Sequence, residues 1–392
     1  MKRQVAYFLS HPIQYFSPLL QAMASEMDLT VYYLSDASVR GNIDKGFGRS
    51  VIWDTPLLEG YKFTFIKNYS WRKSLNNRFA DLINPGVFSA VISDKASIVI
   101  VNGWSYSSII FVIIFSKIRG KKVWLRAENP LNQELKRKKW IIILKKIVLQ
   151  GFLFKFIDKF LFIGLENENF FKFYGAKPAE MIFTPYAVDN LQFQSQHQRI
   201  EYSKVDLKKA KGISDNGKVV LYVGKYINKK RPLDLLKAFQ NINNSAVHLI
   251  MVGEGELRGE MEKFIGDNHL KNVQLTGFIN QSKIANYYAL ADVFVMCSGS
   301  GETWGLAVNE AMNFQLPVII SETCGSASDL IINGKNGFIV PEGDIPKLTD
   351  ALSLVLDNES FRIQAGKESF KIIDRYSIDR IVSNLKQALL SE

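Results

Sequence analysis

The chain has 392 residues, of which 47% are hydrophobic and 22% are charged. This balance excludes a disordered chain, and the length exceeds what one core usually fills, so we expect two domains of roughly 200 residues each. Two cysteines, Cys297 and Cys324, exclude a disulfide framework and fit a reducing compartment.

The net charge of +11 is concentrated in the first half of the chain. Residues 1–200 hold 27 basic against 15 acidic residues, whereas residues 201–392 hold 22 against 23. Residues 117–159 alone hold 13 basic and 3 acidic residues. Such a local basic patch predicts a local anionic partner.

Short apolar runs alternate with longer amphipathic segments, which is typical of βαβ units. In the first half, the expected strands are Gln4–Leu9, Leu29–Tyr33, Ser97–Val101, Lys122–Leu125 and Phe160–Ile163. The first apolar run is too short for a signal peptide, and polar residues and glycine interrupt the longest uncharged stretch, residues 96–116. The sequence therefore predicts a cytoplasmic protein without a membrane span.

The second half repeats this pattern. Its expected strands are Val219–Val223, Val247–Val252, Val273–Leu275, Val293–Met296, Pro317–Ile320 and Phe338–Val340. A polar stretch, residues 194–199, followed by the lysine-rich residues 204–211, is interpreted as the linker. We predict two doubly wound α/β domains, residues 1–198 and 199–392, that face each other across a cleft. The final helix is a candidate to pack back on the first domain. Ligands of such sheets bind at the carboxyl ends of the strands.

Residues 298–312 carry the most informative pattern, because small residues there follow a buried strand and open a helix. Free N–H groups at such a helix start, together with the helix dipole, favour an anion. Glu302 falls in the loop and Glu310 about two turns into the helix, so the two cannot form a tight carboxylate pair. They suit hydroxyls at different points of one ligand. For Glu310, a solvated helical glutamate is the alternative.

Glu302 and Glu310, with seven residues between them, followed by residues 316–318 and 333–338, resemble the donor-site signature of retaining glycosyltransferases of sequence family 4. Other stretches resemble that family's strand ends and its approach to the linker, namely residues 163–164, 185–190, 222–232, 251–255 and 275–278. The whole chain fits the family. The resemblance implies the GT-B architecture of two Rossmann-like domains, a nucleotide-diphosphate sugar as donor, and transfer with retention of configuration.

The resemblance also implies roles for single residues. Glu310 would bind the ribose hydroxyls and Glu302 those of the donor sugar, while Lys225 and Lys230 would hold the diphosphate. The other donor-binding positions are Gly224, the backbone of Thr303, Trp304, Gly305 and Leu306, and the base-binding Gly277, Phe278 and Ile279. Two ammonium groups aimed at the departing oxygens would stabilise the charge that grows there. The family more often has arginine at the place of Lys225, and a solvated basic turn is the alternative for both lysines.

The first domain should bind the acceptor. Relatives often carry a histidine in a loop of this domain over the reaction centre, and His11 is the histidine of this chain that lies in such a loop. Arg126 and Glu128 follow the strand Lys122–Leu125, so their side chains should reach the cleft and contact acceptor or donor. An ion pair beside a loop is the alternative for these two residues.

No cofactor is expected beyond the donor substrate. The sequence has no Asp-x-Asp pair, no cysteine or histidine cluster and no His-Glu-x-x-His motif, so no metal site is predicted. A nucleotide-sugar epimerase of similar architecture is the main alternative function, and a glycosidase is another. A nucleic-acid partner is not expected, because the basic patch lacks a zinc-finger or RNP-like motif.

The resemblance and the basic patch together imply a glycan or lipid-linked acceptor, in the biosynthesis of a bacterial surface polysaccharide such as lipopolysaccharide. On a helical projection of residues 136–159, six lysines fall on one broad half: Lys138, Lys139, Lys145, Lys146, Lys155 and Lys159. Apolar residues fill the other half. This pattern predicts peripheral contact with an anionic membrane, on the inner face of the cell membrane. A core helix with a solvated basic rim is the alternative.

Overall fold

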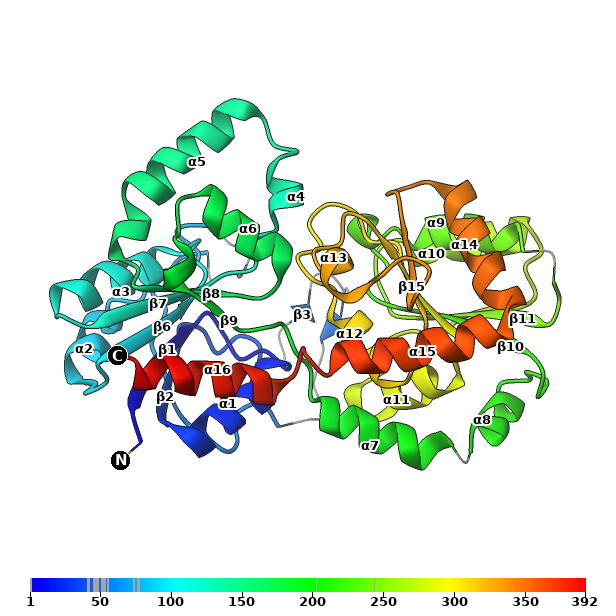
Figure 1. Ribbon diagram of the computed structural model, residues 1–392, viewed down its shortest axis with the longest axis horizontal. Coiled ribbons are helices and arrows are strands. Elements are labelled where there is room, and N and C mark those ends of the chain that lie inside the picture. Colours follow the sequence, from blue (N-terminus) through cyan, green and yellow to red (C-terminus); the bar gives the residue numbers. More distant parts are fainter. Residues whose placement is uncertain are drawn as a thin grey trace. The chain divides into compact units, whose positions relative to one another are not determined.

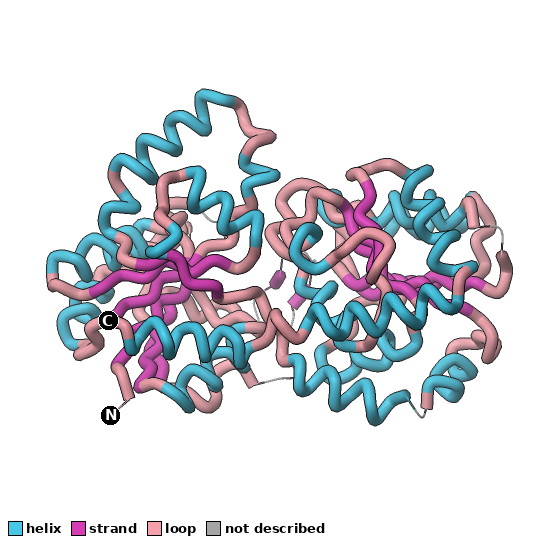
Figure 2. The backbone as a smooth tube through the Cα atoms, viewed as in Figure 1, coloured by secondary structure: helices cyan, strands magenta, loops and turns pink. Residues whose placement is uncertain are grey.

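The computed structural model describes residues 2–40, 43–44, 49–50, 54, 56–72, 75, 78–201, 203–242 and 244–392. The chain forms two compact units. The first unit holds residues 1–42, 56–186 and 378–392, and the second unit holds residues 43–55 and 187–377. Each unit contains one parallel sheet with helices on both faces (Figures 1 and 2). The predicted α/β class with two parallel sheets is confirmed.

The sheet of the first unit has seven parallel strands. Their order across the sheet is β5 (Lys62–Phe65), β2 (Asp28–Tyr33), β1 (Gln4–Leu9), β6 (Ile98–Asn102), β7 (Lys122–Arg126), β8 (Lys159–Phe162) and β9 (Met181–Phe183). The five predicted strands are present within one or two residues. The sequence missed β5 and β9, which are short strands at the two edges of the sheet and lack a buried apolar run.

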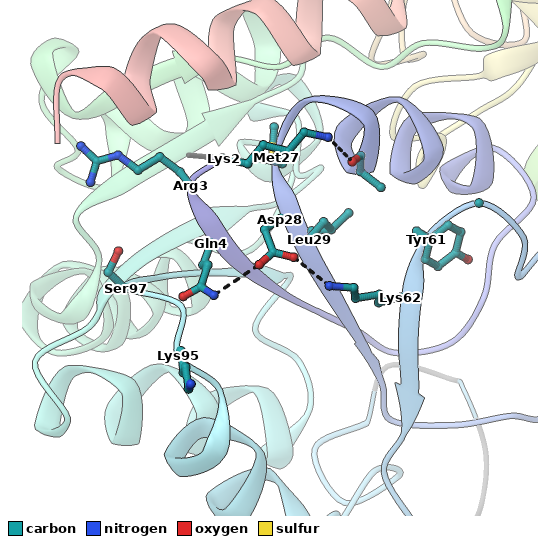
Figure 3. A pocket seen from close by; sticks show the side chains of 12 residues that line it. Lys2, Arg3, Gln4, Met27, Asp28, Leu29, Tyr61, Lys62, Lys95 and Ser97 are labelled. Atoms are coloured by element: carbon teal, nitrogen blue, oxygen red, sulfur yellow. Dashed lines mark hydrogen bonds and ion pairs between the residues drawn. The ribbon is translucent and has the colours of Figure 1, made fainter.

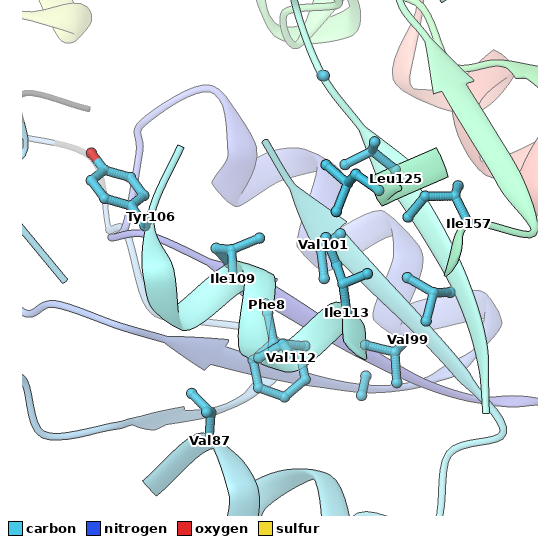
Figure 4. Close-up of a cluster of buried hydrophobic side chains, with 14 of the residues drawn as sticks. Phe8, Val87, Val99, Val101, Tyr106, Ile109, Val112, Ile113, Leu125 and Ile157 are labelled. Carbon is cyan, nitrogen blue, oxygen red and sulfur yellow. The ribbon is translucent and has the colours of Figure 1, made fainter. Parts of the chain in front are cut away.

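Helices of the first unit cover both faces of this sheet. Helix α1 (Phe16–Glu26) packs beside α16 (Ile378–Leu390) on one face. The other face carries α2 (Gly86–Ser93), α3 (Ser107–Ile118), α5 (Lys139–Gly151), α6 (Leu165–Phe173), the short α4 (Leu131–Glu134) and the 3₁₀ turn η1 (Leu153–Phe156). Figure 4 shows the core between them, where Phe8, Val99 and Val101 of the sheet meet Ile109 and Ile113 of α3. This packing holds the strands in place. The predicted site residues of the first unit lie at the carboxyl ends of these strands.

The sheet of the second unit has six parallel strands. Their order is β12 (Val273–Leu275), β11 (Val247–Val252), β10 (Lys218–Val223), β13 (Val293–Met296), β14 (Val318–Ser321) and β15 (Gly337–Val340). All six were predicted, because a strand buried on both faces is a continuous apolar run in the sequence. A separate antiparallel pair joins β3 (Ile43–Asp44) and β4 (Arg49–Ser50).

Two groups of helices enclose this second sheet. One group consists of α9 (Pro232–Gln240), α10 (Arg258–Asp267) and α14 (Ile345–Asp357). The other consists of α7 (Asn190–Glu201), α8 (Lys204–Ala210), α11 (Gln281–Leu290) and α12 (Leu306–Asn313), and α15 (Glu359–Ile373) packs on α12, α13 (Ala327–Leu330) and α14. Among the helices of the described ranges, none combines the length and the apolar character needed to cross a membrane.

The polar stretch at residues 194–199, which the sequence analysis interpreted as the linker, is part of helix α7. This helix packs against α11 and α12, and it buries Phe193 against the rings of Tyr288 and Phe314. Residues 194–199 hold no apolar residue, and the ring of His197, 5.2 Å from that of Phe314, adds to the packing of Phe193. The long segment of the second unit begins at Ala187, whereas the sequence placed the boundary at residue 198.

Candidate functional site

The predicted donor-binding residues lie at one edge of the second unit's sheet. All of its strands are parallel, so their carboxyl ends meet at this edge. Gly224 and Lys225 follow β10, residues 277–279 follow β12, and residues 298–305 follow β13. Ligands of open parallel sheets bind at this kind of edge. The topology therefore brings together three segments that are far apart in the sequence.

The turn after β10 places Lys225 at the start of this edge. The Tyr222 hydroxyl donates a 3.0 Å hydrogen bond to the Lys225 carbonyl, and the Gly224 amide donates one of 2.9 Å to Val252. A Cβ on Gly253 would lie 1.9 Å from the Gly224 carbonyl oxygen, so the ends of β10 and β11 approach closely because Gly253 has no side chain. The backbone that carries Lys225 is thus held on two sides.

Lys230 and Glu302 form an ion pair between the loops that follow β10 and β13. Lys230 ends the 3₁₀ turn η3 (Asn228–Lys230), and the exposed fractions of the two side chains are 17% and 9%. The neighbouring Lys229 makes two hydrogen bonds. Its ammonium donates to the Gly301 carbonyl (2.9 Å), and its carbonyl accepts from the Gly299 amide (2.8 Å). An ammonium has three donors, so Lys230 can hold Glu302 and an anionic ligand at once.

The loop before α12 has a backbone shape that only glycine adopts easily. Gly301 and Gly305 have φ values of +99° and +96°. A Cβ on Gly325 would lie 1.9 Å from the Thr303 carbonyl oxygen. The backbone at Gly325 can therefore approach the loop before α12 only because this residue has no side chain. The loop ends where α12 begins at Leu306, and the helix therefore presents its positive end at the same edge as Lys225 and Lys230.

The ring of Trp304 points into the second unit. The residue is 2% exposed, its Nε1 donates a 2.9 Å hydrogen bond to Asn309, and its ring lies 5.7 Å from that of Tyr376. The predicted contact of residues 303–306 with a donor can therefore come only from the main chain at Trp304. The indole anchors the loop to the start of α12.

Glu310 lies on α12 with its carboxylate buried and bonded to Tyr288 of α11. The Tyr288 hydroxyl donates a 2.6 Å hydrogen bond to Oε2 of Glu310. Burial raises the pKa of Glu310 to about 7, although hydrogen bonds from Tyr288 and Gln281 oppose this rise. The carboxyl group is therefore close to half ionised at neutral pH. The alternative of a solvated helical glutamate is wrong, because Glu310 is 8% exposed.

The predicted base-binding residues lie at the start of α11. Gly277 has a φ of +78°, and its carbonyl accepts a 3.0 Å hydrogen bond from the Gly253 amide. Phe278 and Ile279 are half-buried, and Asn280 caps α11 through the amide of Gln281 (2.9 Å). The same helix thus begins at the base-binding loop and carries Tyr288, the partner of Glu310.

Arg126 of the first unit ends β7 as a buried cation, with 3% of its surface exposed. Its guanidinium lies over the rings of Phe16 and Tyr186, at 5.1 Å and 5.0 Å from the ring centres. Within the described part of the chain, its Nε and Nη1 have no hydrogen-bond partner. A buried guanidinium with open donors is costly unless a ligand completes it.

Glu128 lies two residues beyond Arg126 and accepts a 2.9 Å hydrogen bond from the Tyr186 hydroxyl. Burial raises the pKa of Glu128, and the Arg126 charge opposes that rise. The structure thus brings Arg126 and Glu128 together around one ring, that of Tyr186. Their predicted contact with acceptor or donor stays a prediction.

His11 lies in the loop after β1, as predicted, and is a neutral imidazole at pH 7. Burial lowers its pKa to about 4, and its Nδ1 is 2.9 Å from the Ser10 hydroxyl. A neutral imidazole donates one hydrogen bond and accepts another, but it adds no charge near the leaving group. Burial also raises the pKa of the nearby Tyr7 to about 12.

The sequence analysis missed three residues of these clusters: Tyr186, Tyr288 and Glu342. Glu342 follows β15, accepts a 2.7 Å hydrogen bond from Thr323, and would lie 2.3 Å from a Cβ placed on Gly299. Its place just after a strand was a usable signal, the same one that identified Arg126. The two tyrosines gave none, because their contacts arise only when distant helices and strands pack.

A wide groove of about 1060 Å³ lies at the opposite, amino-terminal edge of the first unit's sheet (Figure 3). Two of its cations already have partners: Lys2 bonds to the Ala24 carbonyl at the end of α1 (3.3 Å), and Lys62 pairs with Asp28 (3.0 Å). None of the predicted site residues lines the groove. Among the described residues, no group of three or more His, Cys, Asp or Glu side chains is gathered to hold a metal ion.

Residues 203–372 match the family model of the glycosyl transferases group 1. Structurally, the chain is similar to Anabaena Alr3699/HepE in complex with UDP, with a TM-score of 0.76 over 100% of both chains at 16% identity. This confirms the predicted resemblance to the GT-B glycosyltransferases. The family match lies within the second unit, the one that carries the predicted donor site.

Two curated relatives are similar in sequence. The sulfoquinovosyl transferase SQD2 of Arabidopsis thaliana is 31% identical over 191 residues, which are 48% of this chain and 34% of that protein. The UDP-Gal:alpha-D-GlcNAc-diphosphoundecaprenol alpha-1,3-galactosyltransferase of Escherichia coli is also 31% identical over 191 residues, 47% of this chain and 48% of that protein. The matches thus span a third to about half of these relatives.

Proposed function

We propose that this chain is a retaining glycosyltransferase that moves a sugar from a nucleotide-diphosphate sugar to a glycan or lipid-linked acceptor. The observation that carries the proposal is the set of groups at the carboxyl edge of the second sheet. In the sequence, Glu302, which pairs with Lys230, precedes residues 303–306, and Glu310, which is bonded to Tyr288, follows them. UDP in the similar solved structure and the UDP-sugar donor in the name of the Escherichia coli relative support a nucleotide-sugar donor.

In this proposal, each group acts on a different part of the donor. Glu310 accepts hydrogen bonds from the ribose, and Glu302 accepts them from the sugar. Lys225, Lys230 and the start of α12 face the diphosphate, where negative charge grows as the glycosidic bond breaks. Their positive charge stabilises the transition state more than the ground state, so the reaction proceeds without a metal ion. The acceptor attacks the same face that the diphosphate leaves, and a phosphate oxygen takes its proton.

Helix α5 supports the proposal that the acceptor is reached at an anionic membrane. It lies at the outside of the first unit (Figure 1), and Leu149 is the single buried residue among its thirteen. Large apolar side chains recur every three to four residues on its exposed side: Trp140, Ile143, Leu144, Ile147 and Val148. A core helix therefore does not describe α5, whereas Leu153 and Phe154 of the following turn η1 are buried in the core. Four successive basic residues, 136–139, lie next to this exposed stripe. The first three precede α5, and the fourth is its first residue.

The six lysines do not share one exposed half as the helical projection predicts. Lys145 turns inward, where its ammonium bonds to Glu134 (2.7 Å) and lies 4.8 Å from the ring centre of Phe170. Lys159 bonds to the Ala179 carbonyl (3.0 Å). The face that α5 offers is an apolar stripe with a basic rim, and such a face enters the interface of an anionic bilayer without crossing it. We propose that the enzyme works there, on the cytoplasmic side, in surface polysaccharide synthesis.

One incubation series tests the proposed activity. The purified protein is titrated by calorimetry with UDP-, GDP- and other nucleotide sugars, and the donor that binds is then incubated with and without a lipid-linked oligosaccharide fraction. Release of the nucleoside diphosphate together with a lengthened glycan supports transfer. Conversion of the donor with no acceptor present would indicate an epimerase instead. Failure of every nucleotide sugar to bind would contradict the proposal.

A further inference from the structure

The connection between β5 and α2, of which residues 66–72, 75 and 78–83 are described, has no helix or strand in those residues. We call it the aromatic loop, because it carries three exposed rings. Tyr69, Trp71 and Phe79 have exposed fractions of 62%, 78% and 61%. A single exposed apolar side chain is ordinary, but several in one short segment can form an apolar patch, and such patches mark contact with other molecules.

A buried polar network holds the base of the aromatic loop. Ser70 and Asp81 are fully buried, and the Ser70 hydroxyl donates a 2.6 Å hydrogen bond to the Ala80 carbonyl. The Asn68 amide group bonds to the Asp81 carbonyl (3.1 Å), and its oxygen accepts from the amides of Ser70 (2.9 Å) and Ile83 (3.0 Å). Both limbs of the loop are therefore tied together just below the rings.

Further bonds tie the loop to the sheet and to α3. Asn84, which follows the loop, is 2% exposed, and its amide donates to the carbonyls of Leu34 (2.8 Å) and Ile66 (2.7 Å), just after β2 and β5. The Ser107 amide at the start of α3 donates to the Phe79 carbonyl (2.9 Å). The rings thus project from a fixed base. A site on such a base loses little conformational entropy when it binds.

The surroundings of the rings indicate which molecule they would contact. The Lys67 ammonium lies 4.8 Å from the ring centre of Tyr69, and the Arg72 guanidinium lies 4.6 Å from that of Trp71. Two of the three rings, Tyr69 and Trp71, therefore have a cation against them, unlike the continuous apolar stripe of α5. An acyl chain would gain nothing from these cations. A sugar ring has an apolar C–H face for an aromatic ring and polar edges for the cations beside it.

We propose that Tyr69, Trp71 and Phe79 form a platform for a pyranose ring of the acceptor glycan, and that Lys67 and Arg72 favour an acidic sugar there. The aromatic loop follows β5, so it lies at the carboxyl edge of the first sheet, the same edge as Arg126 and His11. The inference rests on the proposed transferase function, since it assigns the glycan to that reaction's acceptor. Beyond the proposed function, the inference names the part of the first unit that would hold this glycan.

Saturation-transfer NMR tests the platform directly, because it detects weak contacts between protein protons and a sugar. The probes are cellotriose, maltotriose, lactose and trigalacturonate, each with the full chain. We expect transfer from the protein to at least one probe, stronger for trigalacturonate than for the neutral sugars and weakened by salt. Trp71→Ala and Tyr69→Ala should each lower the affinity at least fivefold, while Trp71→Phe keeps most of it.

A matched control is Phe111→Ala, which removes a ring of α3 that is 47% exposed and lies outside the loop. It should leave the NMR signal unchanged. Thermal melts should show that all variants stay folded, because the removed rings of Tyr69 and Trp71 are mostly in water and that of Phe111 is about half exposed. If no probe binds, or if Trp71→Ala and Tyr69→Ala bind the probes as the unchanged protein does, the platform does not exist. Calorimetry with a nucleotide sugar on the same samples separates that result from failure of the proposed transferase function.

Discussion

The hydroxyl of Tyr288 and the carboxylate of Glu310 are joined by a 2.6 Å hydrogen bond between α11 and α12. This bond links the start of the base-binding loop, through α11, to the residue that the proposal assigns to the ribose. It also keeps a buried carboxyl group satisfied, which is required because an unpaired one would be costly. The pKa of Glu310, raised to about 7 by burial, then makes the site sensitive to pH near neutrality.

Donor affinity should rise with pH around neutrality. Only the ionised carboxylate of Glu310 can accept hydrogen bonds from two ribose hydroxyls, and with a pKa of about 7 its ionised fraction grows about tenfold between pH 6 and pH 8. We therefore expect the affinity for UDP or the preferred nucleotide to grow by up to about tenfold over that range, measured by calorimetry. Glu310→Gln serves as the control, because its affinity still depends on the ionisation of the nucleotide but no longer on that of residue 310. An equal pH dependence in both proteins would contradict this role.

Stability should change in the opposite direction. The folded pKa of Glu310 lies near 7 and its ordinary value is 4.5, so between these values the folded state binds more protons than the unfolded state. Its contribution to the free energy of unfolding is therefore full below pH 4.5 and is lost as the pH rises to about 7. Glu310→Gln should match the unchanged protein at pH 4 and exceed it by about 3 kcal/mol at pH 8 in urea unfolding. Equal free energies of unfolding of the two proteins at pH 8 would show that burial does not destabilise the ionised carboxyl group.

The parallel sheets were predictable from the sequence because buried strands such as β10 and β13 are unbroken apolar runs. Glu302 and Glu310 were identifiable because seven residues separate them around a loop and helix start, and this spacing resembles a known donor-site signature. The inward turn of Lys145 was not predictable. It depends on Glu134 and Phe170, which reach it only after α4 and α6 have packed. Helical projection fixes the direction of a side chain but not what that direction faces.

Removing Lys230 should slow transfer more than it weakens donor binding. In the proposal, its ammonium faces the place where charge grows on the leaving diphosphate, so Lys230→Ala should lower kcat at least tenfold. Lys229→Ala is the matched control, because Lys229 is adjacent but its ammonium bonds to the Gly301 carbonyl instead of Glu302. It should retain most of the activity.

Chelation should have little effect if lysines supply the positive charge at the diphosphate. EDTA should leave the rate of the unchanged protein nearly constant in an assay of nucleoside diphosphate release. A rate that disappears with EDTA and returns with manganese or magnesium would show that the metal-free part of the proposal is wrong.

Arg126 should affect the acceptor and leave the donor unaffected. The two open N–H donors of its guanidinium predict a polar ligand group at the carboxyl edge of the first sheet. Arg126→Lys keeps the charge but loses the fork of donors, and it should raise the KM for the acceptor about tenfold or more at an unchanged Kd for the nucleotide. An unchanged acceptor KM would indicate that Phe16 and Tyr186 hold this arginine for structural reasons alone.

The membrane face of α5 has two parts that can be changed separately. The apolar stripe buries area in the interface, while residues 136–139 supply electrostatic attraction of about 1 kcal/mol each at an anionic surface. The purified protein should therefore float with vesicles that contain phosphatidylglycerol at low salt, and high salt should release it. Replacing Lys136, Arg137, Lys138 and Lys139 with serine should abolish flotation.

Ile143→Ser and Ile147→Ser together should weaken flotation at every salt concentration, because the lost contribution is apolar and salt does not screen it. These side chains are 61% and 64% exposed, so the double variant should stay folded. Leu354→Ser is the matched control: it removes an apolar side chain that is 47% exposed on α14 of the second unit, and it should float like the unchanged protein. All variants should bind the nucleotide normally. If the unchanged protein ignores anionic vesicles at low salt, the proposed membrane contact of α5 is wrong.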